Sequence, residues 1–162
     1  MHIRDCQARD LPVLITLTVE AFRPLFEQYW PALLHPAVFA EDHAQWEANY
    51  HREVPGLHDP AQDRYITLAE DGGQILGFVG WHITGDHSGR LQLVAVDPSA
   101  RRRQVGDTIC RAVLDRMRER GVRVVHVGTG GDDFHAPARG LYESLGFSAF
   151  PVVDYTKVLG QS

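Results

Sequence analysis

The sequence is poor in cysteine and has no long apolar run. Its 162 residues include two cysteines. Cys6 and Cys110 form no Cys-x-x-Cys motif and no Cys/His pair at zinc spacing, so we expect no disulfide and no metal. No stretch approaches the roughly 20 apolar residues that cross a bilayer. The N-terminal residues carry charges where a signal peptide needs an apolar segment. These absences predict a cytoplasmic protein with no membrane partner.

Basic residues are also in the minority. Sixteen Lys and Arg residues face 21 Asp and Glu residues, which gives a formal net charge of −5. A general nucleic-acid binder needs a broad basic surface, so nucleic acid is not an expected partner, although a local basic cluster is compatible with this charge. The composition, with 44% hydrophobic and 23% charged residues, is that of a globular protein. We predict one domain over residues 1–162, a length that buries roughly 70% of the unfolded surface.

Hydrophobic spacing predicts an α/β fold with a mixed sheet. The clearest signal is a hairpin, in which strands at 65–70 and 75–84 flank the turn Asp71-Gly72-Gly73. A valine-rich strand at 122–127 is expected to be central. The other expected elements are a strand at 3–6, a helix capped by Asp10 and ended by Pro24, a helix at about 40–50, a strand at 91–96, an amphipathic helix from Val105 to Gly121, a helix at 137–145 and one or two strands within 150–158.

Three consecutive arginines, at 101–103, precede the amphipathic helix. A helix N-terminus already carries about half a positive charge, so cations there are unfavourable unless an anion occupies the site. A phosphate resolves the conflict, because backbone N–H groups of residues 103–107 point at it and Gly106 lets the backbone approach closely. A solvated arginine turn is the alternative, and position alone leaves both interpretations open.

Two segments resemble the GNAT superfamily of N-acetyltransferases, which transfer an acyl group from acyl-coenzyme A to an amine. The first matches the family's Val-x-Pro strand end followed by R/Q-x-x-G-x-G/A, with Gln104 in place of the first glycine. The second matches the family's closing motif. The matching positions are Val96, Pro98, Arg101 and Gly106 in the first segment and Ala138, Tyr142, Leu145, Gly146 and Phe147 in the second. The resemblance implies an α/β fold with a mixed, mostly antiparallel sheet, helices on both faces and a splayed pair of central parallel strands.

The resemblance also implies acetyl-coenzyme A as the acyl-donor cosubstrate, with no metal. The pantetheine arm would pair with the freed backbone of the strand at 91–96, and the diphosphate would lie at the arginine turn. His135 stands where many family members have an asparagine that contacts the cofactor. The implied cofactor-binding residues are Val94, Val96, Arg101, Arg102, Arg103, Gln104, Val105, Gly106, Asp107, Thr108, His135 and Ala138.

Tyr142 is implied as the general acid. A phenol with an ordinary pKa of about 10 stays protonated at neutral pH and can give its proton to the departing thiolate. The alternative is a helix tyrosine whose ring packs on the sheet. The base that deprotonates the amine is not evident, because Gln92 stands where members often have Glu, and deprotonation through water stays open. The weak candidates near the acceptor are Glu27, Tyr29, His82 and Asp86.

The stretch from Tyr29 to Tyr50 is rich in aromatic residues and histidine. The family binds its acceptor in this region, although these aromatics are equally suited to burying a helix against the sheet. Residues 129–133 are expected to form a loop beside the acceptor or the pantetheine, since the chain lacks G-x-x-x-x-G-K-[ST] for a nucleotide.

The expected function is acetyl-coenzyme A-dependent N-acetylation of a small-molecule primary amine by direct attack. Three questions stay open: acetylation of protein lysines or N-termini, a non-catalytic acyl-coenzyme A sensor, and a homodimer formed through the C-terminal strands.

Overall fold

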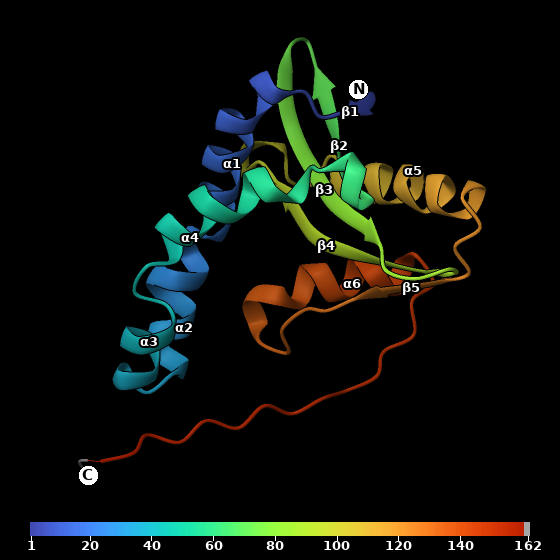
Figure 1. Cartoon of the computed structure of the whole chain (residues 1–162). Coiled ribbons are helices and arrows are strands. Elements are labelled where there is room, and N and C mark those ends of the chain that lie inside the picture. Colours follow the sequence, from blue (N-terminus) through green and yellow to red (C-terminus); the bar gives the residue numbers. More distant parts are fainter. Residues whose placement is uncertain (161–162) are drawn as a thin grey trace.

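A five-stranded sheet forms the centre of the computed structural model, which describes residues 1–160 (Figure 1). Its strands follow the order of the chain: β1 (His2–Asp5), β2 (Arg64–Asp71), β3 (Gln74–Ile83), β4 (Ser88–Val96) and β5 (Val124–Val127). The first four are antiparallel to their neighbours, whereas β4 and β5 are parallel. The mixed, mostly antiparallel sheet predicted from the sequence is therefore confirmed.

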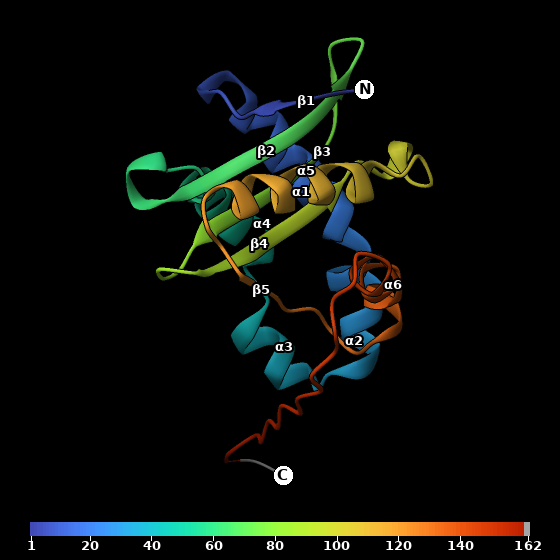
Figure 2. The ribbon, with the colours of Figure 1, turned by 90° about the vertical axis from the view of Figure 1, so that its right-hand side faces the viewer.

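Helices cover both faces of this sheet. They are α1 (Leu11–Pro24), α2 (Trp30–Leu33), α3 (Pro36–Asp42), α4 (Trp46–Glu53), α5 (Val105–Glu119) and α6 (Ala136–Ser144), with 3-10 turns at Ala8–Asp10, Val54–Leu57, Pro60–Gln62, Pro98–Ala100 and Asp133–His135. In Figure 2, α5 lies on the near side of the sheet and α1 behind it. The sheet is thus the middle layer of the molecule.

Two apolar clusters hold these layers together. On one face, residues of α5 spaced four apart, such as Ile109, Val113 and Met117, pack on Trp81 and Leu91 of the sheet. On the other face, side chains of α1 pack on Ile66, Leu68 and Phe78. Each of these large side chains contributes about 1.5–3 kcal/mol when it is fully buried. Alternate residues of each strand therefore face α5 or α1, except where a bulge shifts the alternation.

The β2–β3 hairpin and the helix α5 form as predicted, and α1 ends at Pro24 as predicted. The backbone nevertheless stays helical beyond Pro24, through a π-helical turn, Leu25–Tyr29, into α2. The wider turn restores backbone bonding after the proline, because the Trp30 N–H donates to the Leu25 carbonyl. The single helix expected at about 40–50 is instead two helices, α3 and α4, separated by a turn.

Two strand predictions at the C-terminal end were wrong. The valine-rich strand β5 lies at the edge of the described sheet rather than at its centre, and Val124 is 52% exposed. Residues 150–158 form no strand: they run away from the sheet in an extended tail, with Phe150 88% and Tyr155 91% exposed. β-branched and aromatic composition favours a strand only where a neighbouring strand supplies hydrogen bonds and packing.

Candidate active site

The parallel strands β4 and β5 separate partway along β4. Their pairing runs from Ser88↔Val124 to Leu91↔Val127 and ends there, while β4 continues to Val96. At this point β4 has a bulge, because Leu91 pairs with Trp81 and Leu93 with Gly80, which leaves Gln92 as the extra residue. Gln92 therefore lies where β4 leaves β5, at the position where members of the family that the sequence resembles often have Glu.

Beyond the bulge, β4 has a strand neighbour on one side only. Val94 pairs with Val79 of β3 and Val96 pairs with Gly77, and no strand of the described chain lies on their other side. An unpaired edge leaves backbone N–H and C=O groups free for an extended ligand that adds to the sheet. Both residues that the sequence assigned to the pantetheine arm thus lie on this open edge.

A basic loop leads from the end of β4 into α5. Asp97 accepts a hydrogen bond from the Ser99 backbone N–H at 2.8 Å, which fixes the turn after the strand. Gln104 has a φ of 57°, so it adopts the left-handed backbone that favours glycine, and its side chain does not cap α5. The first-turn amides of α5 are thus left free of a side-chain cap and are suited to an anion.

The three arginines of this loop have different environments. Arg103 forms an ion pair with Asp71 at 2.8 Å, and Arg101 donates to the Ala21 carbonyl at 3.3 Å. Arg102 has a φ of 67° and makes no side-chain hydrogen bond or ion pair within residues 1–160. Arg102 is therefore the guanidinium of this loop with no competing partner.

Side chains in the first turn of α5 have contacts within the protein. Val105 is buried in the core, Asp107 forms an ion pair with Arg111 at 2.9 Å, and the Thr108 hydroxyl donates to the Gln104 carbonyl at 2.9 Å. A Cβ atom on Gly106 would lie 3.2 Å from Leu141 of α6. The glycine therefore lets α6 approach the end of β4, and these residues offer a ligand their backbone rather than their side chains.

Tyr142 lies on α6 and packs against the cluster beneath α5. Its ring centroid is 5.9 Å from that of Phe147. Burial, with a smaller effect of the Cys110 thiol, raises the pKa of Tyr142 to about 12. Burial likewise raises the pKa of Cys110 to about 12, followed by the effect of Asp107. The phenol is therefore protonated at neutral pH, and a thiol in the same surroundings is about equally weak as an acid.

Asp132 links the loop before α6 to the aromatic segment, and His135 bonds to it within that loop. Asp132 accepts hydrogen bonds from the Trp30 indole N–H at 3.0 Å and the His135 backbone N–H at 3.1 Å, and it also bonds the His135 ring through Nδ1. Burial alone would raise the pKa of Asp132, but the hydrogen bonds from His135 and Trp30 outweigh it and lower that pKa. Arg139 fixes the loop by donating to the carbonyls of Gly130 and Asp132.

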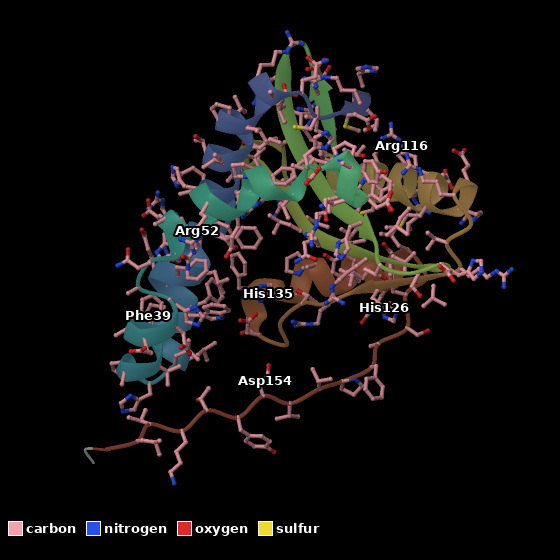
Figure 3. The ribbon with its side chains drawn as sticks, in the orientation of Figure 1. Phe39, Arg52, Arg116, His126, His135 and Asp154 are labelled. Atoms are coloured by element: carbon pink, nitrogen blue, oxygen red, sulfur yellow. The ribbon has the colours of Figure 1, made fainter. Side chains whose placement is uncertain are left out.

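Asp132 thus occupies Nδ1 of His135, and Nε2 of the ring has no hydrogen-bond partner within residues 1–160. Figure 3 shows His135 between α4 and α6, on the side of α6 that faces the helical region. Ala138 lies one turn along, partly buried on α6. No motif in the sequence predicts the hydrogen bond between Trp30 and Asp132, which lie 102 positions apart.

The four weak acceptor candidates do not converge. Glu27 is held by Arg23 at 2.8 Å, and Asp86 lies in the exposed loop between β3 and β4. Tyr29 lies edge-on to Phe134 at 5.5 Å, next to His135 in the chain. His82 is on β3, where burial and then the charges of Arg64 and Arg90 lower its pKa.

The aromatic stretch builds a small core of its own. Phe26 stacks on Trp46 with ring centroids 4.7 Å apart, and Tyr50 packs edge-on to both. Most of these rings thus bury the helical region, as the alternative interpretation of the sequence held. Trp30 bonds to Asp132 of the β5–α6 loop, and Tyr29 and Phe22 lie against Phe134 of the same loop.

Residues 19–147 match the family model described as the acetyltransferase (GNAT) family. The chain belongs to this family. Two mycothiol acetyltransferases are similar in sequence: that of Thermomonospora curvata is 29% identical over 93% of this chain and 50% of its own length, and that of Sanguibacter keddieii is 36% identical over 85% and 45%. The chain thus spans about half the length of these curated relatives.

The fold is also that of solved members of the family. A GNAT acetyltransferase from Brucella melitensis, solved in complex with acetyl-coenzyme A, has a TM-score of 0.63 at 22% identity and covers 91% of this chain and 82% of its own. The resemblance identified in the sequence is confirmed: the chain belongs to the GNAT family, and a structure with the same fold was solved with acetyl-coenzyme A.

The residues present suit acetyl-coenzyme A. The open edge of β4 offers backbone groups to an extended arm, and the loop at its end offers amides and the free Arg102 guanidinium to phosphates. No helix in residues 1–160 is long and apolar enough to cross a membrane. Within the same residues, no three His, Cys, Asp or Glu side chains gather in a way that would hold a metal ion.

Proposed function

We propose that this GNAT protein transfers the acetyl group of acetyl-coenzyme A to a primary amine of a small molecule. The observation that carries the proposal is the opening of β4 from β5 at the Gln92 bulge, with a basic loop at the end of the open strand. Small-molecule chemistry is supported by relatives that are named for mycothiol.

The residues proposed to bind acetyl-coenzyme A follow one another from β4 through the arginine loop, with two more at the start of α6. Val94 and Val96 would hold the pantetheine arm through their backbone. Arg102 and the first-turn amides of α5 would bind the diphosphate, with Arg101 and Arg103 adding positive charge. His135 and Ala138, at the start of α6, would border the arm.

Tyr142 would protonate the departing thiolate. Burial raises the pKa of Tyr142 to about 12, so its hydroxyl keeps its proton until the thiolate departs. A thiolate in the same apolar surroundings would also be desolvated, and desolvation raises the pKa of a thiol, which favours the transfer of the proton to it.

The test is release of free thiol from acetyl-coenzyme A in the presence of a panel of amines. The expected result is thiol release that depends on the amine and is matched by an N-acetylated product in mass spectrometry. Tight acetyl-coenzyme A binding without release for any small amine would overturn the proposal and favour the sensor alternative. Release with peptides alone would favour acetylation of protein lysines or N-termini.

A further inference from the structure

A row of basic side chains crosses the sheet next to the opening between β4 and β5. It consists of Arg64 on β2, His82 on β3, Arg90 on β4 and His126 on β5. The strand register places them directly opposite one another, as Arg64↔His82, His82↔Arg90 and Arg90↔His126. We call these four residues the basic row.

All four side chains lie on the face of the sheet away from α5. Their chain neighbours show this, because Tyr65, Trp81, Leu91 and both Val125 and Val127 pack in the α5 cluster. Residues that alternate with those must point to the other face. Figure 3 agrees for His126, which lies on the side of β5 opposite α5.

The basic row is accessible and unpaired. Arg64, Arg90 and His126 are exposed, and His82 is partly buried. Within residues 1–160 none of the four side chains forms a hydrogen bond or an ion pair, whereas Arg4, Arg23 and Arg116 each contact carboxylates. Although the chain has five more acidic than basic residues, no carboxylate among residues 1–160 pairs with the basic row.

Such an arrangement is unfavourable for folding. The guanidinium groups of Arg64 and Arg90 lie on either side of His82 with no carboxylate of the described residues between them, and their like charges repel one another. Burial, followed by the charges of Arg64 and Arg90, lowers the pKa of His82. An anion bound across the row would remove this repulsion through charge-assisted hydrogen bonds.

The basic row lies at the opposite end of the open strand from the arginine loop. Arg90 precedes the Gln92 bulge and Val96 leads into the loop, so six residues, or about 20 Å of extended strand, separate them. A Cβ atom on Gly128 would lie 3.3 Å from Nη2 of Arg90, so this guanidinium extends to the residue just after the last β4–β5 pair. The row therefore borders the opening at its acceptor side and is far from the donor's diphosphate end.

We propose that the basic row binds an anionic group, a carboxylate or a phosphate, that the amine acceptor carries. The inference rests on the proposed function, since it places the acceptor's amine at the opening of β4. Arg90 contributes most, because it lies between His82 and His126 and reaches the mouth of the opening.

Two matched pairs of amines test this in the thiol-release assay: glucosamine 6-phosphate against glucosamine, and glycine against glycinamide. At least one anionic member should have a kcat/KM roughly tenfold or more above its neutral partner, as expected for a charge-assisted hydrogen bond. The pair that shows the preference identifies the anion as phosphate or carboxylate. Equal or lower kcat/KM for both anionic members would overturn the proposal that the basic row binds an anion, while leaving the proposed function intact.

Arg90→Gln should remove the preference by lowering kcat/KM for the anionic member roughly tenfold, without changing the value for its neutral partner or the KM for acetyl-coenzyme A. Arg118→Gln, an exposed arginine of α5, is the matched control and should leave the preference unchanged. A preference that survives Arg90→Gln would show that the row does not create it.

Binding can also be measured without turnover. The ring signals of His82 and His126, assigned by His82→Gln and His126→Gln, should shift saturably in NMR titrations with glucosamine 6-phosphate or with glycine. The shifts should weaken roughly tenfold in Arg90→Gln. Signals that do not move with either compound would overturn the basic row even if the protein proves inactive as an acetyltransferase.

Discussion

The two basic clusters at the ends of β4 differ in how the chain builds them. The arginine loop is contiguous in sequence, whereas the basic row draws on four strands, from Arg64 to His126. The loop is readable from the sequence because its charges lie side by side before a helix. The row appears only when the strand register is known, because no two of its members are closer than eight positions in the chain.

The clusters also differ in how far the protein itself neutralises them. Two of the three loop arginines have internal partners, Asp71 for Arg103 and the Ala21 carbonyl for Arg101. The row has none within the part of the chain described by the structure. Within residues 1–160 the loop therefore keeps one arginine, Arg102, without an internal partner, whereas all four side chains of the row lack one.

The largest effect should come from Tyr142, the proposed general acid for the reaction. Tyr142→Phe should lower kcat by about 100-fold or more, as removal of a general acid does, while the KM values for donor and acceptor change little. Tyr155→Phe is the matched control, since that ring is 91% exposed in the tail. Steady-state kinetics of both variants make the measurement. An unchanged kcat in Tyr142→Phe would show that another group protonates the thiolate.

The next largest effect should come from the ion pair of Arg4 with Asp10, since Arg4, unlike the arginines of the basic row, is paired with carboxylates. Arg4 donates to Asp10 at 2.8 and 3.0 Å, and Asp10, which is 5% exposed, also accepts from the Gln7 N–H. Asp10→Asn should lower the free energy of unfolding by about 2 kcal/mol at neutral pH, because it removes the buried one of the two carboxylates, Asp10 and Glu70, to which Arg4 donates. Chemical denaturation measures the loss.

This loss should depend on pH in a definite direction. The Arg4 hydrogen bonds outweigh burial and lower the pKa of Asp10 in the native state. A depressed native pKa means that the carboxylate stabilises the fold above its ordinary pKa of about 3.9 and that this stability is lost as pH falls toward the native value. The gap between wild type and Asp10→Asn should therefore be constant near neutrality and narrow below about pH 4. A gap that widens in acid would contradict the pairing.

The two clusters should respond independently to substitution. Arg102→Gln should raise the KM for acetyl-coenzyme A up to about tenfold, since this guanidinium has no internal partner, and should leave the KM for the acceptor unchanged. Arg64→Gln, in the basic row, should do the reverse. Initial rates with each substrate varied in turn distinguish the two. A single variant that changes both KM values equally would mean that the clusters do not bind separate ligands.

The sequence predicted the elements at the donor side of the molecule better than those at the acceptor side. Val94 and Val96 lie on the predicted strand and Gly106 and Tyr142 on the predicted helices, because local motifs specify these elements in succession, while the roles of these residues stay predictions. Asp132 and Trp30 were missed, since their contact requires the helical region to fold back on the β5–α6 loop. The π-helical turn after Pro24 and the unpaired tail at 150–158 were missed for a related reason: backbone propensity does not reveal which partners the tertiary structure supplies.

The smallest expected effect concerns the shape of the arginine loop. Gln104 departs from the family's glycine yet keeps a φ of 57°, a backbone that costs a side-chain-bearing residue about 1–2 kcal/mol. Gln104→Gly should relieve this strain but adds freedom to the unfolded chain, so the net gain in unfolding free energy should be about 0.5 kcal/mol. Gln45→Gly is the control: its φ of −103° carries no such strain, so glycine should destabilise there. Because the amides of α5 keep their positions, the affinity for acetyl-coenzyme A should not change in Gln104→Gly. A loss of affinity would mean that the Gln104 side chain itself binds the donor, and the loop would then depend on side chains as much as the basic row does.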